Sequence, residues 1–352
     1  MYTYYNILIP PVTFFSVLVL EKELELPSWL KRVKMPIPIE SLKFINVYLI
    51  GSENSFSMID AGMYNIRSFH EFSKGISSLG YKICDLESVI VTHFHVDHIT
   101  MSPILQSLGA SDFYLGLKDA RVLSRGFDKF INKAIKLYAN HGMPENEANE
   151  ISKAHPAMRL IDIYSDLQEI PWITLSNDSE IDVQDKKLKV IEVPGHTPGQ
   201  INLFDEKDGI LFVGDHVLDP ITPQITLAEE NTDPLGDYIK SLEKISTLNA
   251  KIAMPGHREP ILNPSKRAKE IIKHHEERLN EILGYIRKKE LNGYEIAKMV
   301  KWRASYNSWE EYPYSERFFA MGETLAHLKR LELEGKIERK MNKNIVYWKA
   351  LV

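Results

Sequence analysis

The chain has 352 residues, more than the roughly 150 of a typical single domain, so we expect two domains. It carries 43 Lys and Arg against 48 Asp and Glu, a net charge of -5, and 44% of its residues are hydrophobic. This composition excludes a disordered, collagen-like or coiled-coil chain. Cys84 is the only cysteine, which excludes an internal disulfide framework and a metal site built from cysteine alone.

The N-terminal segment contains an apolar stretch at residues 4–20. The stretch is too short for a membrane span, and Pro10 and Pro11 interrupt it. It also lacks the basic start and small-residue cleavage site of a signal peptide, so we expect a cytoplasmic protein with no membrane partner. From Met35 onward the sequence alternates as strands do. We interpret residues 1–34 as an N-terminal extension, either an added β-ribbon or the product of a start codon assigned too early.

Strand and helix patterns follow one another between residues 35 and 263. Apolar spacing predicts a helix over 66–79 that ends at Gly80. Residues 117–170 are rich in charges and helix formers, which predicts a helical insertion. Short apolar runs, the first two separated by a Gly51-Ser-Glu-Asn turn, predict strands at 46–49, 56–59, 86–91, 187–193, 200–204 and 210–213.

The net charge of the chain is negative before residue 264 and positive from there on. Residues 264–352 carry 19 Lys and Arg against 13 Asp and Glu, a net charge of +6, which leaves -11 for residues 1–263. This asymmetry indicates two domains with different roles, a catalytic domain at 35–263 and a second domain at 264–352. The second domain is predicted to contain three helices and a hairpin, at 269–289, 294–300, 316–334, and 336–339 with 345–348.

Four residues of types that bind metals follow the predicted strand 86–91 in the pattern His-x-His-x-Asp-His: His93, His95, Asp97 and His98. Imidazole nitrogen and carboxylate oxygen suit zinc, iron or manganese. Three later motifs place His or Asp beside Gly or Pro, where the chain must turn sharply. They are Pro194-Gly-His196-Thr-Pro-Gly199, Gly214-Asp215-His216 and Pro255-Gly-His257-Arg258.

The order of these motifs resembles that of the metallo-β-lactamase-fold hydrolases over roughly residues 36–263. The resemblance implies an α/β fold, a four-layered αβ/βα sandwich with metals at one edge. It implies two divalent metal ions, with zinc expected and iron or manganese as alternatives. The first would be bound by His93, His95 and His196, and the second by Asp97, His98 and His257. Asp215 would bridge both ions.

Two metal ions that share a water can lower its pKa toward neutrality, giving a hydroxide nucleophile. Asp97 and Asp215 are therefore the predicted catalytic residues, holding the metals and orienting the hydroxide. His216 is either a support for a metal ligand or a packed structural histidine. In a lid formed by the insertion, His141 would approach the substrate. We expect the remaining histidines on the surface: His70, His155, His274, His275 and His327.

The element order of residues 264–352 is similar to a winged helix, and to the domain appended to the lactamase-like endoribonuclease group. Its basic side chains form a candidate phosphate-binding surface, comprising Lys329, Arg330, Arg339, Lys340 and Lys343. Glutamates at 332, 334 and 338 alternate with them, as on a solvated helix face. We therefore favour a dimer or lid role for this domain, and expect a homo-oligomer, over nucleic-acid binding.

Three functions remain open from the sequence. The favoured one is hydrolysis of a small-molecule thioester or other ester, as in the glyoxalase II-like hydroxyacylglutathione hydrolases, although their glutathione-binding pattern is absent here. The second is a single-stranded RNA endonuclease whose winged helix presents the strand. The third is a persulfide or thiol dioxygenase that uses a single iron.

Overall fold

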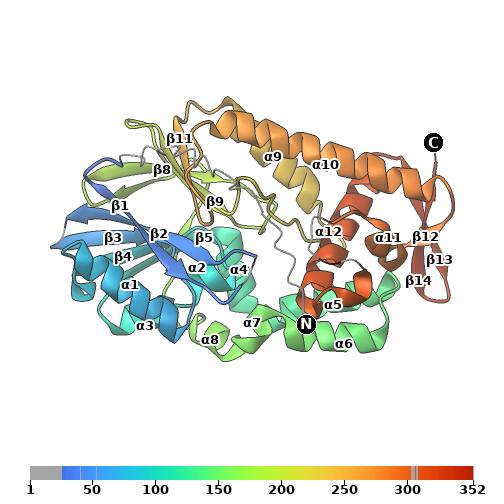
Figure 1. The fold of residues 1–352 in the computed structure, drawn as a ribbon, viewed down its shortest axis with the longest axis horizontal. Helices are drawn as coiled ribbons and strands as arrows, with labels where there is room; N and C mark the ends of the chain where they lie inside the picture. The colour runs from blue at the N-terminus through green and yellow to red at the C-terminus, as the bar shows by residue number, and fades with distance from the viewer. Residues whose placement is uncertain (1–25, 40, 53, 303–305, 307, 352) are drawn as a thin grey trace, which may run out of the picture.

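Two β-sheets stacked face to face form one half of the molecule, at the left in Figure 1, in the computed structural model, which describes residues 26–39, 41–52, 54–302, 306 and 308–351. The first sheet has the order β1-β2-β3-β4-β5-β6, and the second β11-β10-β9-β8-β7. The strands of the first sheet are β1 (Leu30–Pro36), β2 (Phe44–Ser52), β3 (Ser55–Ile59), β4 (Leu86–Val91), β5 (Asp112–Gly116) and β6 (Ile173–Leu175). Those of the second are β7 (Glu180–Val183), β8 (Lys186–Glu192), β9 (Ile201–Asp205), β10 (Ile210–Gly214) and β11 (Ile252–Pro255).

The inner strands β2, β3, β9 and β10 are almost entirely buried, because both faces of the sheets are covered there. Tyr48 and Ile50 of β2 point into the layer between the sheets, where the Tyr48 ring meets the edge of Phe212 with centroids 5.4 Å apart. Val47 and Leu49 of the same strand belong to the core on the opposite, helix-covered side. The alternation of side chains along one strand therefore supplies both cores.

Helices cover the outer faces of both sheets (Figure 1). α1 (Ile66–Ser78), the short α2 (Val96–Ile99) and α3 (Ser102–Ser107) lie beside the first sheet, with the 3₁₀ turn Ile83–Asp85 before β4. α9 (Pro234–Thr247) packs on the second sheet, and α10 (Pro264–Ile286) runs along α9. The predicted four-layered αβ/βα sandwich is thereby confirmed.

The segment predicted as a helical insertion consists of five helices between β5 and β6: α4 (Leu117–Arg125), α5 (Phe127–Asn140), α6 (Glu145–Ala154), α7 (Pro156–Arg159) and α8 (Ile161–Asp166). Its helices pack against the C-terminal part of the chain. Tyr294 donates from its hydroxyl to Glu147 Oε2 at 2.7 Å, and the His141 ring stacks on Trp348 with centroids 5.6 Å apart. The insertion and the C-terminal part thus share one apolar core.

The C-terminal part contains the predicted helices followed by a hairpin. The end of α10 leads into β12 (Leu291–Asn292), α11 (Gly293–Met299), the 3₁₀ turn Trp309–Glu311, α12 (Tyr314–Leu333), β13 (Ile337–Asn342) and β14 (Ile345–Ala350). The three strands pair in the order β12-β14-β13. Asn292 begins α11 with a capping box, since its side chain accepts from the Glu295 backbone N–H while the Glu295 carboxylate accepts from the Asn292 backbone N–H.

Two expectations need correction. The boundary at Met35 falls inside β1, which pairs with β2 from Leu30 onward; the β-ribbon and start-site hypotheses otherwise concern residues outside the described part. His155, His275 and His327 are buried rather than on the surface. His275 Nδ1 lies 3.2 Å from His327 Nε2 where α10 meets α12, and the His155 ring packs on the Phe318 ring. These are contacts between distant segments, which local sequence does not reveal.

Candidate metal centre

Every predicted metal ligand follows the carboxyl end of a strand. His93, His95, Asp97 and His98 follow β4, while the other three follow strands of the second sheet: His196 after β8, Asp215 after β10 and His257 after β11. These strand ends meet at one edge of the sandwich. Nitrogen and oxygen atoms lie within 4.8 Å of one another in three groups: His93, His95 and His196; His93, His98 and Asp215; Asp97, His98 and His257.

The Asp215 carboxylate lies between these groups. Its Oδ1 is 3.5 Å from His98 Nε2, and its Oδ2 is 3.5 Å from His257 Nε2 and 3.8 Å from His196 Nε2. Asp97 Oδ2 is 3.0 Å from His257 Nε2. The two oxygens of Asp215 therefore face histidines of both predicted metal sites.

The donor atoms at this edge fit metal ions. Five of them are buried without a hydrogen-bond partner, an arrangement that costs free energy unless something binds there: Asp97 Oδ2, His98 Nε2, His196 Nε2, Asp215 Oδ1 and His257 Nε2. Three of these histidines donate from the opposite nitrogen, Nδ1. The acceptors are Asp60 Oδ2 at 2.8 Å from His98, the Gln224 carbonyl at 2.8 Å from His196 and the Phe44 carbonyl at 2.7 Å from His257. Nε2 is then the nitrogen of each ring that would bind a metal ion.

Burial and charge divide the histidines into two kinds. Burial lowers the pKa values of His93, His95 and His196, which are therefore neutral imidazoles. Burial also opposes charge on His98 and His257, yet nearby carboxylates, Asp60 for His98 and Asp215 for both, raise their pKa values. Although burial acts the other way, His257 and His98 hold the pKa of Asp215 well below its usual range.

Asp60 is a site residue that the sequence analysis missed. It follows β3 with φ of 62°, and its carboxylate accepts from the Thr92 backbone N–H at 2.8 Å as well as from His98. This one side chain therefore fixes both the start of the His93–His98 turn and the orientation of His98. The pattern Asp60-Ala-Gly62 directly after a strand is the local signal from which it could have been found.

Asp119 on α4 was also missed. Its buried carboxylate accepts from Phe94 N at 3.1 Å, Thr197 Oγ1 at 2.7 Å and Gly199 N at 2.6 Å. It thereby connects the turn that carries His93 and His95 to the turn that carries His196. Burial raises the pKa of Asp119 to about 7, against the effect of these donors. In the sequence it is one charged residue among many in a helix-forming segment, so no local signal marks it.

The close packing around Gly256 explains why a glycine precedes His257. A Cβ atom at this position would lie 2.5 Å from His98 Cε1 and 2.9 Å from Asp215 Oδ1. Both are fixed parts of the centre rather than ends of flexible side chains. Only a residue without a side chain leaves room for the two groups to approach each other.

Two other histidines considered in the sequence analysis, His216 and His141, belong to none of these metal groups. His216 is buried, its Nδ1 accepts from Asn202 Nδ2 at 3.1 Å, and its ring packs on Tyr238. These contacts fit a packed structural histidine, one of the two roles considered for this residue. His141 is buried against Trp348 and does not line the cavity described below, so it is not placed as a lid residue.

Four of the five basic residues proposed for nucleic-acid contact have carboxylate partners. Lys329 pairs with Glu332 at 3.4 Å, Arg330 with Asp233 at 3.0 Å, Arg339 with Glu332 at 2.6 Å and Lys340 with Glu290 at 2.5 Å. Lys343 is exposed at the hairpin turn. Phosphates would compete with these carboxylates, and nucleic-acid contact stays a prediction.

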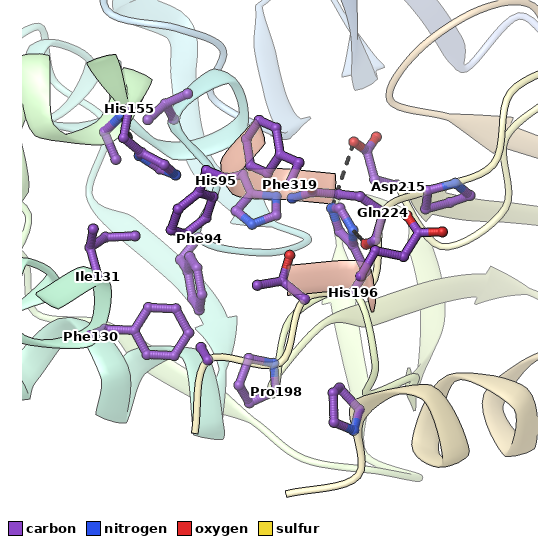
Figure 2. Close-up of a pocket in the computed structure, with 18 of the residues that line it drawn as sticks. Phe94, His95, Phe130, Ile131, His155, His196, Pro198, Asp215, Gln224 and Phe319 are labelled. Carbon is purple, nitrogen blue, oxygen red and sulfur yellow. Dashed lines mark hydrogen bonds and ion pairs between the residues drawn. The ribbon is translucent and has the colours of Figure 1, made fainter. Parts of the chain in front are cut away.

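A cavity of about 1390 Å³ opens onto the metal centre. Figure 2 shows His95, His196 and Asp215 directed into this space, with Phe94, Phe130 and Ile131 forming an apolar side. α12 contributes Phe318 and Phe319 to the wall. A fourth group that could hold a metal, comprising His274, His275 and Glu323, lies at the α10–α12 contact, and His274 and Glu323 line the same cavity.

A sandwich of this kind, with histidines and aspartates gathered at one edge, is the fold of a metallo-hydrolase. The chain belongs to the metallo-β-lactamase superfamily, since the sequence model of that family matches residues 41–257. Residues 314–350 match the metallo-β-lactamase-like C-terminal domain. The chain is similar to the probable metallo-hydrolase YqjP of Bacillus subtilis, with 24% identity over 91% of this chain and 97% of the relative. It is also similar to the β-lactamase-like protein 2 homolog of Caenorhabditis elegans, with 25% identity over 85% of this chain and 82% of that one. Among solved structures, a metallo-β-lactamase family protein from Thermus thermophilus superposes with a TM-score of 0.76 at 25% identity, covering 93% of this chain and all of its own.

No helix among the described residues is both long and apolar enough to cross a membrane.

Proposed function

We propose that this metallo-hydrolase uses two divalent metal ions, preferably zinc, to hydrolyse a thioester or other ester of a small molecule. The observation that carries the proposal is the position of Asp215, whose two oxygens face His98 on one side and His196 and His257 on the other. A carboxylate placed in this way can bridge two ions. His93, His95 and His196 would hold the first, and Asp97, His98 and His257 the second.

When bound, such ions lower the pKa of a shared water toward neutrality and polarise the substrate carbonyl. Asp97 and Asp215 orient that water by accepting its hydrogen bonds. The water oxygen adds to the carbonyl carbon, the bond from carbon to sulfur or oxygen breaks, and a carboxylate, a thiol or alcohol, and a proton leave. The neutral His93, His95 and His196 supply ligands without adding positive charge that would need compensation.

The cavity supports a small-molecule substrate. It is bounded by α5 of the insertion and α12 of the C-terminal part, so a substrate that reaches the metals is enclosed on several sides. Phe94, Phe130 and Ile131 would contact an apolar acyl group beside the reacting carbonyl. Basic residues of the C-terminal part are largely engaged by carboxylates, which gives less support to RNA as the substrate.

Metal analysis followed by a substrate panel tests this function. We expect two metal ions per chain at the strand-end centre, and hydrolysis of thioesters or esters in a panel that also contains lactones, phosphodiesters and single-stranded RNA. Asp215→Asn should reduce turnover more than 100-fold, because even partners that only support ligands cost about 10- to 100-fold. His70→Ala, at an exposed position of α1 outside the metal groups and the cavity lining, is the control and should keep full activity. Cleavage of RNA alone would contradict the proposal in favour of an RNA endonuclease, and one iron per chain with oxygen consumption would contradict it in favour of a dioxygenase.

A further inference from the structure

A row of basic side chains lies along one wall of the cavity. Lys118, Arg121 and Arg125 are spaced three and four residues apart on α4, which places them on one face of the helix. Lys129 follows near the start of α5. All four line the cavity that opens onto the metal centre, and all four are exposed. We call these residues the basic stripe.

The stripe is unusual in its surroundings. Residues 1–263 have a net charge of -11, yet this wall carries four cations. Lys133, one turn further along α5, pairs with Glu229 at 3.0 Å. By contrast, the ion pairs between described residues include no member of the stripe. Lys118 is close enough to Asp119 and Asp237 to act against the rise that burial causes in their pKa values. Carboxylates on α12, Glu316 and Glu323, also line the cavity without pairing to the stripe.

The stripe is fixed relative to the reaction centre. Asp119, the residue after Lys118, accepts hydrogen bonds from Phe94 N and Gly199 N, on the two turns that carry His95 and His196. The first turn of α4 is therefore anchored beside the predicted first metal site. The apolar Phe94 and Phe130 line the same cavity.

The length of the basic stripe favours an anion with several phosphates over one with a single carboxylate. Lys118 and Arg125 are separated by seven residues of helix, about 10 Å along the axis. A single carboxylate reaches one or two of these cations, whereas two or three phosphates spread along a chain reach most of them. Arg side chains form paired, charge-assisted hydrogen bonds with phosphate oxygens, and two of the four residues are arginines.

We propose that the basic stripe binds the phosphate groups of the substrate's leaving group, so that the substrates are acyl thioesters of a phosphorylated thiol of the coenzyme A type. This inference rests on the proposed function and specifies its substrate class. Water adds to the thioester carbonyl, the carbon–sulfur bond breaks, and the carboxylate and the phosphorylated thiol are released with one proton. The acyl group lies against the apolar wall and the phosphates against the stripe.

The experiment compares two thioesters of the same acyl group: butyryl-coenzyme A, and butyryl-N-acetylcysteamine, which lacks phosphates. Arg121→Glu should raise KM for the coenzyme A thioester about tenfold or more, the effect of losing a charged hydrogen bond, while kcat changes less than twofold. KM for the phosphate-free thioester should not rise. Lys136→Glu, an equal charge change at an exposed α5 position outside the cavity, should leave both values unchanged. Lys129→Glu repeats the test at a second position of the stripe, and thermal unfolding checks that each variant is folded.

Direct binding separates failure of this inference from failure of the proposed function. Calorimetry with coenzyme A itself should show binding that weakens with salt and is lost in Arg121→Glu, even if no thioester proved to be a substrate. Hydrolysis of both thioesters with equal KM, unaffected by Arg121→Glu, would overturn the role of the stripe and leave the proposed function intact. Stripe-dependent binding of single-stranded RNA at concentrations where coenzyme A does not bind would overturn it in favour of RNA.

Discussion

Replacing Asp60 with asparagine should weaken metal binding at one half of the centre without removing any predicted ligand. Asp60 accepts from Thr92 N and from His98 Nδ1, both at 2.8 Å. In Asp60→Asn the amide carbonyl can continue to accept from Thr92 N, so the amide NH₂ faces His98. His98 would then place its proton on Nε2, the atom that must be free to bind a metal.

The magnitude follows from this forced choice. To bind a metal, His98 in the variant must return its proton to Nδ1, where it meets another donor. A buried donor without an acceptor costs about 1–3 kcal/mol, which corresponds to a metal affinity reduced about 10- to 100-fold. The loss should concern the ion bound by Asp97, His98 and His257, while the His93, His95 and His196 site keeps its affinity.

Zinc titration of the metal-free protein against a competing chelator measures both affinities. We expect two similar steps in the unaltered protein and two separated steps in Asp60→Asn. Asp205→Asn is the matched control, since Asp205 is equally buried and accepts from Lys207 N at 3.0 Å and Asp208 N at 3.3 Å, in a turn that carries no predicted ligand. Identical titrations for Asp60→Asn and the unaltered protein would refute the reasoning.

Three further substitutions test other contacts. Asp119→Ala leaves Phe94 N, Gly199 N and the Thr197 hydroxyl without their acceptor, and should lower the free energy of unfolding by about 3–5 kcal/mol in guanidinium titrations; unchanged stability would contradict the role given to Asp119. Gly256→Ala should lower the free energy of unfolding by about 1–3 kcal/mol and reduce metal content, because its Cβ would lie 2.5 Å from His98 Cε1. Gly284→Ala is the control: a Cβ there has no neighbour within 4 Å, so the change should stabilise α10 by up to about 1 kcal/mol. Equal effects of the two changes would be inconsistent with the packing. Burial lowers the pKa of His141 to about 3, so below pH 6.5 the unfolded chain binds a proton that the folded chain does not, and stability falls as the pH falls from 6.5 toward 3. His141→Phe should therefore reduce the loss of unfolding free energy between pH 7 and pH 5 by about 2 kcal/mol; the same loss as in the unaltered protein would contradict this reasoning.

Local sequence predicted the features that depend on short segments. The turn from His93 to His98 lies directly after an apolar strand, and the later motifs pair a ligand with the glycine or proline that its turn needs. Such motifs are visible because ligand and backbone requirement are neighbours in the chain. The fold class followed from their order, and the superfamily match confirms it.

Features that depend on contacts between distant segments could not be predicted in this way. Asp119 acts through Phe94 and Gly199, 25 and 80 residues away. Arg330 and Arg339 pair with Glu334 and Glu332, which the sequence shows beside them, but their other partners, Asp233 and Glu230, lie about a hundred residues earlier. His155 and His275 resembled surface histidines because nothing nearby in the chain shows that α12 packs on them; His327, on α12 itself, is buried by the contact with α10.

The origin of the ligands in both sheets has a thermodynamic consequence. Each predicted ion takes ligands from the turn after β4 of the first sheet and one histidine from the second, His196 or His257. Metal ions would thus link the two halves of the sandwich at the edge where the strands end. Ions that bind only the folded chain add about 2.7 kcal/mol each when free metal exceeds the dissociation constant 100-fold. Metal supply would then regulate not only turnover but how long the folded protein persists, and a cell short of metal would lose the enzyme itself as well as its activity.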